Sequence, residues 1–163
     1  MIIKQPFETK KQRKPLYRKP ESIKELEQAY FEYECKKYPN FPNYARVVTK
    51  FRDDNANGLT RCIVKWLEMH QYFAGRVNTT GIYSQKLKKY IYSGSKRGMA
   101  DVTAVIDGRH VSIEVKVGKD KMRLAQVEVK REIEQAGGVY IVASSFDNFL
   151  EQIEVIRENI ITH

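Results

Sequence analysis

The sequence predicts a mixed α/β fold in which helices pack against a β-sheet. Segments with helical spacing of apolar residues alternate with segments rich in Val and Ile, in the order helix, strand, strand, strand, helix, strand. Asp107-Gly108 between two apolar runs is a strong β-hairpin signal. The run VYIVA at 139–143 is short and wholly apolar, which is typical of a strand inside a sheet.

The helices are predicted from apolar spacing and from the residues at their ends. Ser22-x-x-Glu25 is a capping box that opens the first helix. This helix should end at Tyr38, because the residue before a proline disfavours helix. Asn57 can cap the second helix. The predicted helices therefore span residues 22–38, 57–70, 120–136 and 146–159.

The strands are predicted from β-branched runs bounded by turn residues. They span residues 72–81, 86–94, 100–106, 109–117 and 139–143. The chain then divides into a basic flexible arm (1–20), an extension of one helix and a loop (21–56), a core (57–143) and a C-terminal helix (144–163). Its length of 163 residues is that of one domain with a core of its own.

Charge and composition indicate the class of partner. Residues 1–20 contain seven lysines and arginines and one glutamate, so this arm supplies +6 of the net charge of +9. A basic arm beside a nearly balanced domain favours nucleic acid, whereas the alternative is an arm that only aids solubility. No apolar run has the length of a membrane span, and the N-terminus has no signal-peptide core. With only two cysteines, we expect a cytoplasmic protein without a membrane partner.

The hairpin places charged residues on one face of apolar strands. If Asp107-Gly108 forms a type I′ turn, Ile106 pairs with Arg109 and Asp101 lies opposite Glu114. Alternation then puts Glu114 and Lys116 on one face of the second strand. Two carboxylates about 5 Å apart repel each other unless a proton or a cation lies between them.

A hard divalent cation is one partner for such a pair. Mg²⁺ takes one or two carboxylates together with waters and a substrate phosphate. The backbone carbonyl of Val115 would be a further ligand, and Lys116 would orient or deprotonate a water that attacks phosphorus. The alternative for the hairpin alone is a solvated face with a surface salt bridge.

The order of motifs around the hairpin extends the pattern. The series is Gly98-Met-Ala-Asp101, Asp107-Gly-Arg109, Ile113-Glu114-Val115-Lys116, Gln126 and Gly137-Gly138. It resembles the virus-type replication-repair nuclease domain of the PD-(D/E)xK nuclease superfamily, over roughly residues 57–143. The resemblance implies a nuclease-like mixed β-sheet flanked by helices, with the core order α-β-β-β-α-β. It also implies a Mg²⁺-dependent DNA endonuclease, with Mn²⁺ as a substitute, that cuts flaps, splayed arms or Holliday junctions.

The resemblance also implies roles for individual residues. Asp101 and Glu114 match the metal-binding carboxylates, Lys116 matches the catalytic lysine, and Gln126 matches a helix glutamine that supports the site. Family members carry a glutamate near the position of Asn57. Asp53 or Asp54 would replace that glutamate from the preceding loop, or Asn57 would act through a water; the departure also leaves room for a weakened enzyme.

Basic residues near the predicted site are candidates for contact with nucleic acid. Those before Asp101 flank the site, and those at the start of the third predicted helix oppose its dipole unless an anion binds there. The candidates are Arg76, Lys96, Arg97, Lys119, Lys121 and Arg123. His110 shares the face of the carboxylates but lies near the turn, and we expect it to be solvated.

Two functions from different classes follow. One is a structure-selective DNA endonuclease, and the other is a nuclease-fold DNA-binding subunit that is weak or inactive in catalysis; RNA is a third, weaker substrate class. Retention of Asp101, Glu114, Lys116 and Gln126 favours the enzyme. By analogy with enzymes that act on branched DNA we expect a homodimer, and a role in replication, repair or recombination in a phage or a mobile element.

Overall fold

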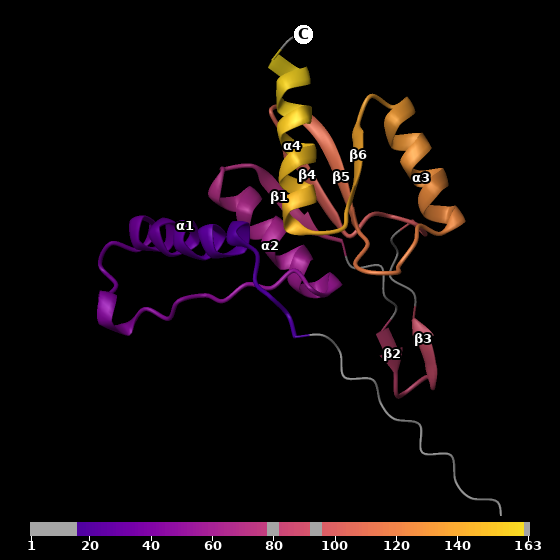
Figure 1. The fold of residues 1–163 in the computed structure, drawn as a ribbon. Helices are drawn as coiled ribbons and strands as arrows, with labels where there is room; N and C mark the ends of the chain where they lie inside the picture. The colour runs from indigo at the N-terminus through magenta and orange to yellow at the C-terminus, as the bar shows by residue number, and fades with distance from the viewer. Residues whose placement is uncertain (1–15, 78–81, 92–95, 162–163) are drawn as a thin grey trace, which may run out of the picture.

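The computed structural model describes residues 16–77, 82–91 and 96–161 (Figure 1). Its helices are α1 (Glu21–Lys37), the 3₁₀ turn η1 (Asn43–Ala45), α2 (Ala56–Met69), α3 (Leu124–Gln135) and α4 (Phe146–Ile161). Its strands are β1 (Phe73–Arg76), β2 (Ile82–Ser84), β3 (Lys89–Ile91), β4 (Val102–Ile106), β5 (Arg109–Val115) and β6 (Val139–Ala143). The predicted mixed α/β class is confirmed.

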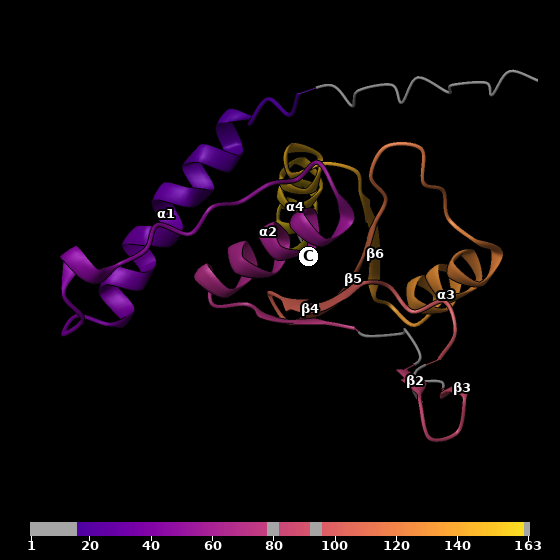
Figure 2. The ribbon, with the colours of Figure 1, turned by 90° about the horizontal axis from the view of Figure 1, so that it is seen from below.

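The main sheet has the strand order β1-β4-β5-β6. The pairs β1/β4 and β4/β5 are antiparallel, whereas β5 and β6 are parallel and α3 connects them. Helix α3 covers one face of this sheet, and α2 and α4 cover the other (Figures 1 and 2). Because β5 lies between two strands and between two layers of helices, its residues from Val111 to Val115 are buried on both faces.

The larger hydrophobic core lies on the face of α2 and α4, and α1 also contributes to it. Val111, Ile113 and Val115 of β5 point into this core, and full burial of such a side chain stabilises the fold by about 1.5–3 kcal/mol. A smaller cluster lies under α3 and includes Val129 and Tyr140. Alternation along β5 therefore directs Ser112 and Glu114 toward the α3 side.

The predicted hairpin register is confirmed. Val102 pairs with Ile113 and Ile106 pairs with Arg109. The turn residues Asp107 and Gly108 have φ angles of 47° and 80°, the positive values that a type I′ turn requires.

The helix ends differ from the predictions. Helix α1 begins at Glu21 after Pro20, with no side-chain cap, and the Ser22 hydroxyl is buried without a hydrogen bond from the described residues. The N-cap of α2 is Asn55, whose side chain accepts from the Gly58 N–H at 2.9 Å, because a cap must precede the first helical turn. Asn57 therefore lies inside the helix and is not its cap.

The third helix is also shorter than predicted. It begins at Leu124 and not at Asp120, so the segment 116–123 is a loop between β5 and α3. Arg123 is the N-cap, and the Gln126 side chain accepts a hydrogen bond from the Arg123 N–H at 2.8 Å.

The predicted strands between α2 and the hairpin need two corrections. The first is limited to β1, and residues 78–81 lie outside the described residues. The second, predicted at 86–94, contains β3, which pairs with β2 in a separate two-stranded sheet. The side chains of β3 are exposed, so this strand has no apolar face to bury against the main sheet.

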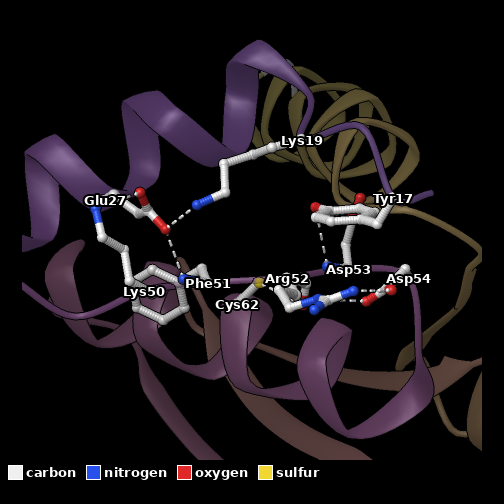
Figure 3. Close-up of polar contacts among 9 residues, drawn as sticks. All are labelled: Tyr17, Lys19, Glu27, Lys50, Phe51, Arg52, Asp53, Asp54 and Cys62. Carbon is white, nitrogen blue, oxygen red and sulfur yellow. Dashed lines mark hydrogen bonds and ion pairs between the residues drawn. The ribbon is translucent and has the colours of Figure 1, made fainter.

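An extended segment before α2 joins the N-terminal extension to the core (Figure 3). The buried Glu27 of α1 accepts from the Phe51 N–H at 2.7 Å and from Lys19 Nζ at 2.5 Å. The buried Asp53 accepts from the Tyr17 hydroxyl at 2.8 Å and from the Phe146 N–H, at the start of α4, at 3.2 Å. These bonds hold residues 17–27, the segment 51–53 and α4 together.

Candidate active site

Two carboxylates lie side by side near the C-terminal end of β5, on the face of the sheet that α3 covers. Glu114 is buried, with 2% of its surface exposed, and Asp101 directly precedes β4. The observed register, continued by one residue, places Asp101 opposite Glu114. The Asp101 carboxylate Oδ2 accepts from the Val115 N–H at 2.9 Å, which fixes it beside the backbone of β5. The predicted pairing of these two acids is therefore what the structure contains.

Three side chains from different elements contact Glu114. Gln126 of α3 donates a hydrogen bond from Nε2 to Oε1, and Lys116 Nζ lies 3.0 Å from the same oxygen. The Tyr140 hydroxyl of β6 donates to Oε2 at 3.4 Å. The structure thus brings together all four residues predicted to be catalytic: Asp101, Glu114, Lys116 and Gln126.

Burial and charge act on Glu114 together. Burial raises the pKa of its carboxyl, the neighbouring Asp101 carboxylate raises it further, and Lys116 only partly offsets both. The pKa of Tyr140 is also raised, by burial and by the charge of Glu114. A carboxyl whose pKa is raised by a second carboxylate is a common feature of functional sites.

Lys116 lies between two carboxylates. Its Nζ contacts Glu114 Oε1 at 3.0 Å and Asp120 Oδ2 at 3.3 Å, and the side chain is largely buried. Burial lowers the pKa of Lys116, but Glu114 and Asp120 outweigh this effect, so the pKa lies above its usual range. Lys116 is therefore an ammonium group in this structure.

Sequence reasoning missed two members of this cluster. Asp120 was assigned to the start of a helix, and Tyr140 was assigned to an apolar strand. The parallel pairing of β5 and β6 places Ser112 opposite Tyr140, so Tyr140 lies on the face of Glu114. A polar hydroxyl within the otherwise apolar VYIVA was the available signal.

The donor set fits a hard cation. In an extended strand the N–H and the C=O of one residue point to the same side, so the Val115 carbonyl projects toward Asp101, to which its N–H donates. Asp101, Glu114 and this carbonyl are the oxygens that would hold such a cation, since Mg²⁺ usually takes one or two carboxylates with waters and phosphate. Within residues 16–77, 82–91 and 96–161, no group of three or more His, Cys, Asp and Glu side chains is arranged to hold a metal.

The predicted nucleic-acid contacts fall into two groups beside the site. Lys119, Lys121 and Arg123 lie exposed on the loop that leads from Lys116 to α3. Lys96 and Arg97 lie exposed on the loop before Asp101, and Lys96 forms an ion pair with Glu132 of α3.

This second loop is held against α3 at a glycine. Gly98 has a φ of +86°, and a Cβ at this position would lie 2.3 Å from the carbonyl oxygen of Ala125. Both basic loops therefore border α3.

Arg76 lies apart from these loops, and its partner is Asn57 in the first turn of α2. Its guanidinium donates to Asn57 Oδ1 at 2.6 Å. Asp53 and Asp54, the candidates to replace the glutamate of the resembled family, both have other partners. Asp53 accepts from Tyr17 and the start of α4, and Asp54 forms an ion pair with Arg52 at 2.6 Å.

His110 lies at the turn end of the sheet. It is exposed, as predicted, and its Nε2 lies 3.0 Å from the Thr103 hydroxyl. The contacts of Glu114 come instead from Gln126, Lys116 and Tyr140.

No protein-family model matches the chain, and no curated protein matches it either. In the part of the chain that the structure describes, none of the helices combines the length and the apolar character that a bilayer crossing needs.

Proposed function

We propose that this chain is a metal-dependent endonuclease that hydrolyses phosphodiester bonds in DNA and selects branched structures. The observation that carries the proposal is the Asp101–Glu114 pair with the Lys116 ammonium 3.0 Å from Glu114. Gln126 and Tyr140 hold Glu114 from a helix and a neighbouring strand, so its orientation does not depend on solvent. Such a preorganised group of charges is the usual means of stabilising charge that develops in a transition state.

The residues have separate roles in hydrolysis. Asp101, Glu114 and the Val115 carbonyl would hold Mg²⁺ or Mn²⁺, which would supply charge neutralisation at the phosphate and a bound water of lowered pKa. Water attacks phosphorus and gives up a proton to solvent, the P–O bond to the leaving sugar oxygen breaks, and the leaving oxygen takes a proton from solvent. Because Lys116 carries a proton, its roles are to orient the attacking water and to stabilise the charge on the phosphate oxygens.

The basic loops support nucleic acid as the substrate. Lys119, Lys121, Arg123 and Arg97 are exposed and form no ion pair with the described residues. These four cations border α3, which supplies Gln126 to the site. Cations in this arrangement attract a phosphate backbone without reading its sequence, which suits an enzyme that selects DNA by shape.

The second candidate function is a DNA-binding protein with weak or no catalysis. It is favoured by Asn57, because the start of α2 offers Arg76 an amide where the resembled family carries a carboxylate. Branched DNA presents equivalent arms, so we propose a homodimer for either function. Light scattering after gel filtration, with and without a Holliday junction, measures this assembly directly.

The test is cleavage of a labelled panel: Holliday junction, 5′ flap, splayed arm, duplex, single-stranded DNA and RNA. Each substrate is incubated with Mg²⁺, Mn²⁺ or EDTA. We expect metal-dependent cutting of a branched DNA, lost in Lys116→Ala and Asp101→Asn and kept in the matched controls Lys24→Ala and Asp147→Asn. Binding of branched DNA without cutting under either metal would favour the binding protein, and cutting of RNA alone would reject DNA as the substrate.

A further inference from the structure

A pocket of about 280 Å³ lies between α2 and the edge strand β1. Its lining from α2 is Asn57, Thr60, Arg61, Val64 and Lys65, and β1 contributes Arg76. The α2 residues are spaced three and four apart, so they form one face of the helix. Three of the six lining residues are cations.

The contacts of these cations leave most of their charge uncompensated. The Arg61 guanidinium lies over the Phe51 ring, 5.4 Å from its centroid, and Arg76 donates to the neutral Asn57 amide. Lys65 pairs with Glu68 at 2.7 Å and also lies 5.8 Å from the Tyr30 ring centroid. Within the described ranges, Glu68 is the only carboxylate in an ion pair with this set.

Aromatic and amide partners orient a cation without neutralising it. Arg61 and Arg76 are exposed, so a ligand reaches them from solvent. Asn57 uses its carbonyl oxygen to accept from Arg76, and its amide NH₂ donates to no acceptor among the described residues, so it can donate to a ligand oxygen. Guanidinium and amide side chains that line one pocket can match the oxygens of a phosphate group.

The pocket and the carboxylate pair lie at the same end of the sheet. Arg76 at the end of β1 pairs with Val102, which directly follows Asp101, and the Val77 N–H donates to the Asp101 carbonyl at 2.8 Å. Glu114 and Val115 lie at the corresponding end of β5, one strand further along. A strand of nucleic acid that crosses this end of the sheet would meet both places.

We propose that Arg61, Arg76 and Asn57 bind a phosphate, and that it is a backbone phosphate next to the one that is cut. That the phosphate belongs to DNA rests on the proposed function. That the pocket binds a phosphate does not. It assigns to Asn57 a role in orienting Arg76 and donating to phosphate, in place of a role at the metal.

The experiment uses the full chain in EDTA, so that binding is measured without cutting. A fluorescein-labelled splayed-arm DNA is titrated at several salt concentrations with the wild type, Arg61→Gln/Arg76→Gln, and the control Arg157→Gln on α4. We expect the double variant to bind at least about tenfold more weakly at 0.1 M salt, and its log–log salt slope to fall by about 1, the value for one lost phosphate. The Arg157→Gln variant should lose less than twofold.

A parallel arm separates the two sources of phosphate. The side-chain Nε resonances of Arg61 and Arg76 are followed by NMR while inorganic phosphate is added. If inorganic phosphate shifts these resonances but the double variant binds DNA as tightly as the wild type, the pocket is a phosphate site for a small molecule. That result would reject a backbone phosphate of DNA as its ligand. An unchanged salt slope without any shift of these resonances would overturn the inference, even if the Lys116-dependent cleavage of DNA is observed.

Discussion

Two buried glutamates in this chain have opposite electrostatic surroundings. Glu27 is 8% exposed and Glu114 is 2% exposed. Burial alone would raise both pKa values, but Lys19, the Phe51 N–H and Lys50 lower the pKa of Glu27 below its usual value. Beside Glu114 stands the Asp101 carboxylate, and the pKa of Glu114 is raised.

The difference is the one expected between a carboxylate that stabilises the fold and the carboxylate of the proposed active site. The contacts of Glu27 favour its charge, so Glu27 stabilises the fold at neutral pH (Figure 3). Glu114 holds a charge that its surroundings disfavour, which is a cost to stability that a bound cation would remove. Burial by itself is therefore a poor sign of a functional site, and a second carboxylate that Lys116 offsets only in part is the better one.

The largest expected effect is on catalysis. Glu114→Gln keeps the volume of the side chain and removes its charge, so it should lower DNA cleavage with Mg²⁺ by at least about 10²-fold. Glu27→Gln, the same substitution in the other surroundings, should keep cleavage within about twofold of the wild type. Single-turnover rates on the preferred DNA measure both effects. An equal loss of cleavage in the two variants would contradict the proposed difference in role between Glu114 and Glu27.

The second effect is on stability. Glu27→Ala leaves the buried Phe51 N–H without its acceptor, and should lower the free energy of unfolding by about 1–3 kcal/mol. Urea unfolding followed by circular dichroism measures this change. Because the folded pKa of Glu27 lies below its ordinary value of 4.5, the stabilising effect is complete above pH 4.5. The part of this effect that depends on the charge is lost as the pH falls through the folded pKa, so the difference between the two proteins should narrow in acid.

A smaller effect tests the neighbouring carboxylate. Tyr17→Phe removes the hydroxyl that donates to Asp53, while the Phe146 N–H still donates to the other oxygen. The loss of one fully buried hydrogen bond to a charged group costs about 1.5–3 kcal/mol. Because Tyr17 is half-buried, we expect a smaller cost here, of about 1 kcal/mol. Urea unfolding also measures this change. An unchanged free energy of unfolding would mean that the Phe146 N–H of α4 is enough to stabilise the Asp53 carboxylate.

The smallest effect concerns a thiol beside this cluster. Cys62 is buried and donates to the Arg52 carbonyl, and burial raises its pKa to about 12. At pH 8 it is a thiol and not a thiolate, so it should not react with a disulfide reagent in the native protein. Cys35 is only half-buried. We expect one fast equivalent in the native protein and two in urea, with Cys35→Ser as the control that leaves none in the native protein.

Local sequence patterns predicted the helices, the hairpin and the carboxylate pair, but not the ends of the helices or the separate β2/β3 sheet. The Asp107-Gly108 turn determines the hairpin register, and the register alone places Asp101 opposite Glu114. Helix ends depend on competition between neighbouring caps. Asn55 and Asn57 both have a side chain able to cap α2, and the contact with Arg76 occupies Asn57.

The contacts made by distant residues could not be predicted from spacing. Tyr140 contacts Glu114 because β6 pairs in parallel with β5. The sequences of the two strands do not predict the register of that pairing. Asp53 was a candidate ligand because it is acidic and near the expected site. Its partners, Tyr17 and Phe146, lie 36 and 93 residues away in the sequence.

The bond between Asp53 and the start of α4 has a consequence for synthesis on the ribosome. Before Phe146 has emerged, Asp53 lacks the N–H that one of its oxygens accepts in the folded chain, and the core lacks Phe146, Phe149 and Ile153 of α4. A carboxylate without its donors resists burial. We therefore expect the nascent chain to keep the segment before α2 hydrated until α4 has been translated.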